Sequence, residues 1–306
     1  MVVAAGSQTP GTPAPDVEWP ARELISDLAK ELRGLEGAAR KDRADAVHRM
    51  RSVSRRLRSA LAALDAGPET PVHVAAKGLR WLGATLGYNR DSEVIQLRLQ
   101  DHADGADDPA ARRVARRLIA VERRNRGVTH AAVVKALGSK RYRRTMAALD
   151  AVGAAESPVG TADAREYAAA ERLRSDLERV RRRARREAGN TDPLLAERKL
   201  HSVRKAARRL RYDAEAAAVD APGIGVWAAS LAAAAERVQH ELGAFRDSAL
   251  VQELVVASSA GSGERSGEAA GDGRGAQNDL LRVERTLGEA ALDRARAAIA
   301  ALLAEG

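Results

Sequence analysis

The sequence predicts an all-helical protein made of two similar helical bundles. Apolar residues recur at helical spacing from residue 21 onward, no stretch shows the alternation of a half-buried strand, and two motifs occur twice in the same order. Hydrophobic residues make up 45% of the 306 residues but aromatic residues only 3%, so Ala, Leu and Val must form the core. Small aliphatic side chains of this kind suit closely packed helices.

The first bundle is predicted to span residues 21–150. It follows residues 1–20, which hold four of the ten prolines and predict a disordered leader. Helices are predicted at 21–38, 43–65, 72–101 and 109–150. A break is expected around Gly138, and the segment GPETP at 67–71 ends one helix and starts the next.

The second bundle is predicted to span residues 164–306, after a linker at 151–163. Its helices are predicted at 164–188, 193–219, 224–257 and 279–304. The segment 258–278 is rich in Gly, Ser and Ala and predicts a flexible loop.

Two repeated motifs indicate an internal duplication. The pattern H-x-x-R-x-x-x-R-R-L-R occurs at 48–58 and again at 201–211. LGYNRD at 86–91 follows the first copy at nearly the distance at which LGAFRD at 242–247 follows the second. The Gly of each LGxxRD segment is expected to allow close approach of helices.

Each histidine–arginine motif predicts a helix with one apolar face and one cationic face. At 100° per residue, His48, Arg51, Arg55 and Arg58 fall within about 80° of one another, opposite Met50 and Leu57. The second motif repeats these positions with His201, Arg204, Arg208 and Arg211. Arg56, Lys205 and Arg209 flank the two stripes.

The cationic faces have few acidic residues near them in the sequence. Segment 40–64 has eight Lys or Arg against two Asp, and 198–212 has seven against none. Stacked like charges destabilise a helix by a few tenths of a kcal/mol per pair, about the reverse of an ion pair. A single sign of charge, repeated with histidine, therefore predicts an anion site, and the planar arginine fork suits phosphate oxygens.

The whole chain is basic, with a net charge of +9 and a pI near 10.3, which favours a polyanionic partner. Segment 112–144 adds twelve Lys or Arg against one Glu, so Arg112, Arg113 and Arg116 are possible supporting residues. The chain has no cysteine, no run of apolar residues that spans a membrane and no recognisable signal peptide, so a cytoplasmic protein is expected.

The two motifs, in this order over an all-helical chain, resemble the CHAD family, the conserved histidine α-helical domain. The resemblance covers roughly residues 20–306 and implies two four-helix bundles related by a pseudo-twofold axis, with a basic channel or cleft between them. It further implies binding of inorganic polyphosphate and association with polyphosphate granules. The CYTH domain of many relatives carries E-x-E-x-K, which does not occur here, so a stand-alone binding module is expected.

The resemblance assigns polyphosphate binding to the eight motif residues, and we add the three flanking residues as candidates. Arg90 and Arg246 of the LGxxRD segments have two interpretations. Each either forms an ion pair that fixes helix packing or reaches through to the ligand. Arg90 falls in a stripe with Leu86 and Leu97, which favours the first interpretation.

Other functions have weaker support from the sequence. No histidine has a companion at metal-ligand spacing, no carboxylate is placed to orient His48, and no nucleotide-binding loop is present, so we expect no enzyme, metal or cofactor. The alternative is a nucleic-acid-binding protein that uses the same basic surface, although aromatic residues for base stacking are scarce.

Overall fold

The computed structural model describes residues 21–305 except 44, 63, 65–66, 156–160, 189–192 and 261–267. Every regular element in this part of the chain is a helix, so the predicted all-helical fold is confirmed. The predicted leader at 1–20 lies outside the described residues.

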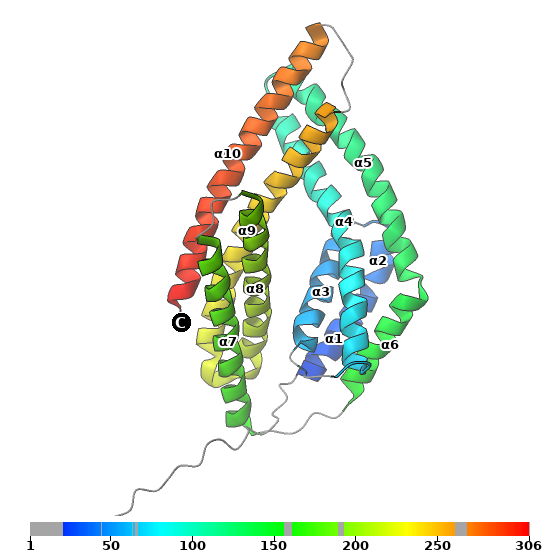
Figure 1. The fold of residues 1–306 in the computed structure, drawn as a ribbon. Helices are drawn as coiled ribbons and strands as arrows, with labels where there is room; N and C mark the ends of the chain where they lie inside the picture. The colour runs from blue at the N-terminus through cyan, green and yellow to red at the C-terminus, as the bar shows by residue number, and fades with distance from the viewer. Residues whose placement is uncertain are drawn as a thin grey trace, which may run out of the picture.

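The first half of the chain contributes six helices to the described structure. They are α1 (Ala21–Gly34), α2 (Glu36–Arg40), α3 (Ala46–Leu61), α4 (Pro71–Gly105), α5 (Pro109–Leu137) and α6 (Lys140–Ala154). Helix α4 packs against α3 on one side and against α5 and α6 in succession on the other. Figure 1 shows this half as one arm of an arch.

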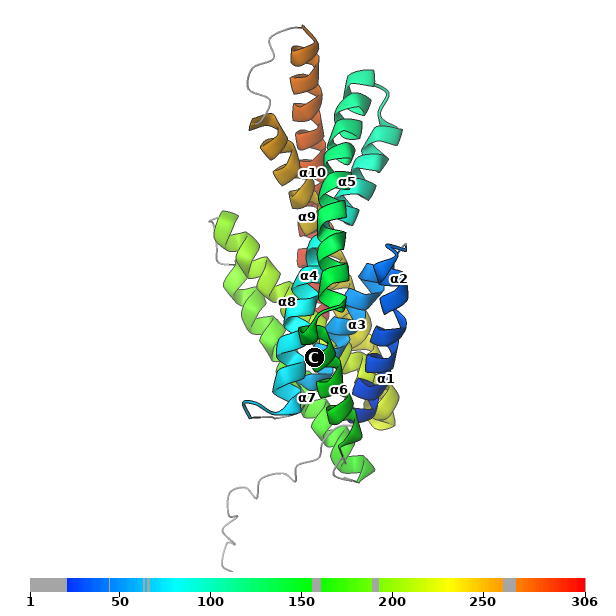
Figure 2. The same ribbon diagram turned by 90° about the vertical axis from the view of Figure 1, so that its right-hand side faces the viewer.

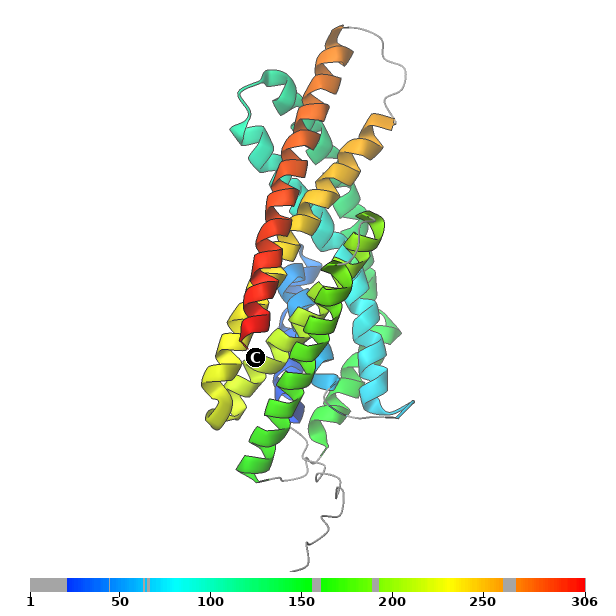
Figure 3. The same ribbon diagram turned by 60° about the vertical axis from the view of Figure 1, so that its left-hand side comes forward.

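The second half forms the other arm of the arch in Figure 1. It consists of α7 (Ala162–Ala188), α8 (Pro193–Asp220), the 3-10 helix η1 (Pro222–Ile224), α9 (Gly225–Ala260) and α10 (Glu268–Ala304). Helix α9 packs against α8 and α10 along its length, and Figure 3 shows α10 running beside α9. The order α3–α4–α5/α6 thus resembles α8–α9–α10, although the duplication itself stays a prediction.

Three hydrophobic clusters hold the arch together. One lies within the first arm and is centred on buried leucines such as Leu57 and Leu82, and another lies within the second arm around Leu210 and Leu231. The third joins the arms at the apex, where Leu99 of α4 and Leu118 of α5 pack with Val251 of α9. Because this apical cluster draws on both halves, the bundles share part of their core.

Several helix starts follow from local capping chemistry. The Thr70 hydroxyl accepts a hydrogen bond from the backbone N–H of His73, and Pro71 occupies the first helical position. Ser139 caps α6 in the same way, so the predicted break around Gly138 is confirmed. Each of these helix starts is therefore determined by residues within one turn of the start itself.

Other predicted boundaries were wrong. The helix predicted from residue 43 begins only at Ala46, because Asp42 and Asp45 adopt left-handed φ angles of 47° and 57° that turn the chain. The helix predicted at 21–38 is divided at Leu35 into α1 and α2.

The predicted linker and the predicted loop are both shorter than expected. Helix α6 extends to Ala154 and α7 begins at Ala162, inside the linker predicted at 151–163. Helices α9 and α10 also take up both ends of the loop predicted at 258–278, because Ala276 and Gln277 are buried in the apical region. A low-complexity sequence can therefore continue a helix that packs on one face.

Candidate functional site

A groove between the two arms collects side chains from both histidine–arginine motifs. It has a volume of about 1090 Å³ and lies among α3, α8, α9 and the C-terminal part of α10. The motif residues in its lining are His48, Arg55 and Arg56 of α3 and Arg204, Arg208 and Arg211 of α8. The structure thus brings two distant segments of the sequence to one shared space.

The arginines of the groove lining, together with Arg51, which is not part of that lining, are close enough to repel one another. Burial, followed by the positive charge of Arg55, lowers the pKa of Arg208. Burial also lowers the pKa of Arg51, and the positive charges of Arg55 and Arg204 lower it further. Arginine still keeps its charge in this environment, so the groove stores electrostatic repulsion that an anion would relieve.

Three nitrogen atoms of this site are buried without a hydrogen-bond partner among the described residues. They are Nδ1 of His48, Nε of Arg55 and Nε of Arg204. A buried polar group without a partner costs free energy, typically about 1–3 kcal/mol. The three residues line the groove, so the lining carries polar groups that no described residue satisfies.

The LGxxRD segments support the arginine at the fourth position of each motif. A Cβ atom at Gly243 would lie 3.2 Å from Nη2 of Arg204, and a Cβ atom at Gly87 would lie 3.8 Å from Nε of Arg51. The glycines therefore leave room for these guanidinium groups, whereas no backbone atom of another described helix lies within 4 Å of either added Cβ, so the expected close approach of helices at these glycines was wrong.

The aspartates of the same segments act as counter-charges. Burial lowers the pKa of Arg204, and the negative charges of Asp247 and Asp91 act in the opposite direction. Asp91 likewise opposes the lowering of the pKa of Arg51 by burial. Burial in turn raises the pKa of Asp247 against the opposing effect of Arg204. Where α4 packs against α9, two partly buried acids thus partly offset the charge of two partly buried arginines.

A second pocket continues the basic surface beyond Arg204. It has a volume of about 610 Å³ and lies between α8 and α9. The basic residues in its lining are Arg198, His201, Arg204, Lys205 and Arg246. Arg204 lines both pockets, so His201 and Lys205 lie on the far side of Arg204 from the groove.

Both motif histidines have a lowered pKa. Burial is the largest cause for His48, followed by the positive charges of Arg90 and Arg55, while Asp45 and Glu93 act in the opposite direction. Burial is also the largest cause for His201, followed by the positive charges of four residues. These residues are Lys205, Arg208, Arg204 and Arg246.

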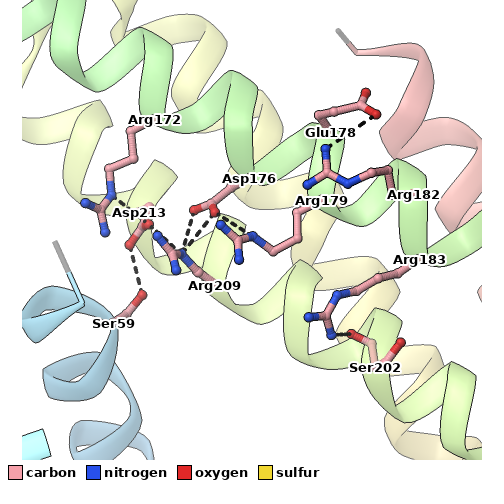
Figure 4. A network of polar contacts seen from close by, with 10 residues as sticks. All are labelled: Ser59, Arg172, Asp176, Glu178, Arg179, Arg182, Arg183, Ser202, Arg209 and Asp213. Carbon is pink, nitrogen blue, oxygen red and sulfur yellow. Dashed lines mark hydrogen bonds and ion pairs between the residues drawn. The ribbon is translucent and has the colours of Figure 1, made fainter.

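Arg209, a predicted polyphosphate-binding residue, is paired with acidic residues of the protein. Figure 4 shows that it points into a network of carboxylates on α7 and α8. Its Nε lies 3.0 Å from Oδ1 of Asp176 and 3.6 Å from Oδ2 of Asp213. Burial and the neighbouring Asp213 raise the pKa of Asp176. Arg209 therefore neutralises buried acids and helps to hold α7 against α8.

Arg211 lies in the groove but is already paired. Its guanidinium group lies 2.6 Å from Glu215 and 2.9 Å from Glu236. Arg294 of α10, another groove residue, pairs in the same way with Glu241 at 2.8 Å. The α9–α10 side of the groove is therefore closer to neutral than the side formed by α3 and α8.

Several candidate residues do not join the groove. Arg58 is exposed and lies near Arg80, outside both basic pockets. Arg112, Arg113 and Arg116 are exposed on α5, which lies on the outer side of its arm in Figures 1 and 2.

Arg90 forms a partly buried ion pair, as the first of its two interpretations expected, but within its own helix. Arg90 forms an ion pair with Glu93 at 2.9 Å, and Leu97, predicted to share its buried stripe, is 57% exposed. Arg246 pairs with Glu253 at 2.9 Å and also lines the second pocket.

Some groove residues were not singled out from the sequence. Tyr212, Gln239 and His240 line the groove, as do Arg237 and Arg294. Tyr212 follows the second motif directly, which could have drawn attention to it. The position of Arg294 depends on how α10 packs against α9, and no local pattern reveals that.

Comparison with known proteins agrees with this architecture. The sequence profile of the CHAD domain matches residues 23–256. The chain belongs to the CHAD family. Two uncharacterised proteins from strains of Mycobacterium tuberculosis are 31% identical to it in an alignment of 266 residues that covers 83% of this chain and 49% of theirs. This CHAD chain therefore spans about half the length of the curated relatives it matches.

Two solved structures share the CHAD fold of this chain. The CHAD domain from the plant Ricinus communis has a TM-score of 0.65 and 22% identity, with 94% of each chain covered. PptA from Streptomyces chartreusis has a TM-score of 0.62 and 17% identity, covering 91% of this chain and 97% of PptA. At these identities, the similarity establishes the fold.

The described part of this CHAD chain lacks two further kinds of feature. None of the described helices is long and apolar enough to cross a membrane. The same residues contain no group of three or more His, Cys, Asp or Glu side chains placed to hold a metal ion.

Proposed function

We propose that this CHAD chain binds inorganic polyphosphate, without hydrolysing it, in the groove between α3 and α8. The observation that carries the proposal is the convergence of Arg55, Arg204 and Arg208 on one groove, with donor nitrogens that lack protein partners among the described residues. A phosphate chain would accept hydrogen bonds from the guanidinium groups that line the groove and relieve the repulsion between them.

The family supports the same proposal. CHAD domains in general are linked to polyphosphate binding, and the chain belongs to that family. The second pocket beyond Arg204 extends the basic surface, so a linear polyanion longer than the groove would meet His201 and Lys205 next. Contacts on both sides of Arg204 would add avidity for long chains. In cells, we expect the protein at polyphosphate granules.

Hydrolysis is not part of the proposal. The carboxylates that line the groove are occupied as partners of arginine, as for Glu215 with Arg211 and Glu241 with Arg294. A carboxylate held in such a pair is a weak base and a poor ligand for a metal ion. We expect no release of phosphate from polyphosphate in the presence of Mg²⁺ or Mn²⁺.

Nucleic acid is a weaker candidate for the groove itself. Tyr212 is the one aromatic side chain among the described residues of the groove lining, whereas proteins that bind single strands stack successive bases on several aromatic rings. The groove thus offers phosphate contacts and little for bases.

The decisive experiment removes charge from each side of the groove in turn. Arg51→Glu/Arg55→Glu and Arg204→Glu/Arg208→Glu should each weaken polyphosphate binding by about a hundredfold or more, since a hydrogen bond to a charged group contributes roughly 1.5–3 kcal/mol. The control Arg182→Glu/Arg185→Glu makes the same charge change on the exposed surface of α7 and should leave affinity within about twofold.

The salt dependence provides a second readout of the same experiment. Wild-type affinity should fall steeply with salt, with a slope that rises by nearly one for each phosphate contact. Each groove variant should give a shallower slope than the control. If either double variant stays folded by circular dichroism and binds like wild type, the shared groove is not the site.

A further inference from the structure

The N-terminal part of α5 carries a ridge of arginines on the outside of the molecule. All six are exposed: Arg112, Arg113, Arg116, Arg117, Arg123 and Arg124, which we call the arginine ridge. None of them lines the groove or the second pocket. Figures 1 and 2 show α5 on the outer side of its arm, where its N-terminal end extends toward the apex.

The arginine ridge has no acidic partners in the described part of the chain. Its one side-chain hydrogen bond there runs from Arg112 to the backbone carbonyl of Asp107. The acidic residue within α5, Glu122, is buried and accepts hydrogen bonds from Ser92 and Asn125. Glu122 therefore faces α4 and leaves the charge of the ridge uncompensated.

Helix α7 shows that other arginine-rich helices of this protein do pair their arginines with acidic residues. It is also rich in arginine, but Arg174 pairs with Glu171 at 2.6 Å and Arg181 pairs with Glu178 at 2.9 Å within the same helix. Like charges one turn apart weaken a helix, and opposite charges strengthen it. The arginine ridge thus weakens α5, and no described residue compensates for it.

The six arginines form two parallel rows. At 100° per residue, Arg112, Arg116 and Arg123 fall on one line, and Arg113, Arg117 and Arg124 fall on another about 100° away. The strip between the rows holds Ala120 and Gly127, both exposed and small. With a rise of 1.5 Å per residue, the rows extend over about 18 Å of helix.

The two-row geometry of the arginine ridge favours some polyanionic partners over others. A membrane-binding helix needs large apolar side chains next to its cations, and the strip between the rows has none among its described residues. A single phosphate chain lying along the helix would meet one row and leave the other row pointing away. Two phosphate strands separated by the width of a helix would meet both rows.

The major groove of B-form DNA has these dimensions. It is about 12 Å wide, and a helix with its side chains is about 10–12 Å across. We propose that the arginine ridge docks α5 in the major groove of duplex DNA, with one row on each phosphate strand. Ala120 and Gly127 would face the base edges and offer no side-chain donor or acceptor, so binding is independent of sequence.

The proposal is tested by fluorescence anisotropy with a labelled duplex of about two turns of B-DNA at low salt. Arg112→Gln/Arg116→Gln/Arg123→Gln and Arg113→Gln/Arg117→Gln/Arg124→Gln should each weaken DNA binding about tenfold or more. Each triple should also lower the salt slope by about 0.9 per lost contact. The control Arg182→Gln/Arg185→Gln/Arg186→Gln removes the same charge from exposed positions of α7 and should change affinity less than twofold.

Two further arms separate this site from the polyphosphate groove. The groove variant Arg204→Glu/Arg208→Glu should still bind duplex DNA, and both ridge variants should still bind polyphosphate. An RNA duplex of the same sequence should bind at least about tenfold more weakly than DNA, because the major groove of an A-form helix is too narrow for α5.

Three results would each overturn the proposal. The first is duplex binding that the ridge variants leave unchanged while the groove variant abolishes it. The second is equal affinity of the protein for the RNA and DNA duplexes. The third is that the ridge variants bind polyphosphate more weakly than wild type but bind DNA with unchanged affinity. The proposed polyphosphate function would survive the second and third results, so the two proposals can fail separately.

Discussion

Helices α3 and α8 carry the same motif, yet their arginines have different surroundings. Arg56 and Arg58 of α3 form no ion pair with any described residue, whereas Arg209 and Arg211, at the same positions of α8, are held by four carboxylates. Those carboxylates come from α7, α8 and α9. A repeated motif therefore fixes which side of a helix is cationic, and the neighbouring helices decide which cations are available to a ligand.

The largest expected difference between the two motif helices is in stability. Arg209→Gln leaves Asp176 and Asp213 with less neutralising charge in a buried site. Because Arg209 is 31% exposed, we expect the free energy of unfolding to fall by about 2 kcal/mol, less than for a fully buried pair. Urea denaturation measures this change.

The matched variant Arg56→Gln should change the free energy of unfolding by less than about 0.5 kcal/mol, as is typical of positions without such a pair. The comparison would be wrong if both variants lost the same stability. It would be sharpened if Arg209→Gln kept wild-type polyphosphate affinity, since that separates a structural arginine from a binding one.

The next effect concerns pH. Both motif histidines have a lowered pKa in the free protein, and a bound polyanion should raise it. The complex then holds more protons than the free protein, so affinity should rise as pH falls through the window between the free and bound pKa values. If binding raises the pKa of a histidine by about one, that histidine contributes up to about tenfold in affinity.

Polyphosphate affinity measured from acidic to neutral pH tests this linkage in His48→Gln and His201→Gln separately. The two histidines are tested separately because different charges lie around them. Both are partly buried, but the acids Asp45 and Glu93 lie near His48, whereas His201 is surrounded by cations. A pH dependence that persists in the double variant would show that neither histidine takes up the proton.

A smaller effect is expected at the paired glycines. In Gly243→Ala the new methyl group would lie 3.2 Å from Nη2 of Arg204, so this flexible guanidinium group must shift, and affinity should fall about threefold. In Gly87→Ala the distance to Nε of Arg51 is 3.8 Å, which is an ordinary contact, and affinity should not change. Isothermal titration with polyphosphate would distinguish the two variants, and equal losses would contradict this interpretation of the site.

The smallest effect on polyphosphate affinity is expected when Arg211 loses one of its ion-pair partners. Glu236→Gln removes one of its two acidic partners and should raise polyphosphate affinity about twofold to threefold, because an exposed ion pair contributes only a few tenths of a kcal/mol. Glu171→Gln, which affects the exposed pair with Arg174 on α7 outside both pockets, provides the control. A loss of affinity in Glu236→Gln would indicate that the glutamate orients Arg211 for binding.

Local sequence was sufficient for the helical fold and for much of the site. Helical periodicity located most helices, and capping residues such as Thr70 and Ser139 marked their starts. Periodicity also placed Arg51 and Arg55 opposite the buried Met50 and Leu57, because side-chain direction on a helix depends only on spacing along it. The sequence therefore determined which residues form the cationic face of α3 and of α8.

The tertiary structure alone decided which of those cations remain available. Asp176 and Glu236 lie more than twenty residues from the arginines they neutralise, and their distance in space follows from how α7 and α9 pack against α8. The split of α1 and α2, the helical ends of the predicted loop and the shared apical core also depend on packing between distant segments. An ion pair depends on distances within a few ångströms, and only the assembled arch sets those distances.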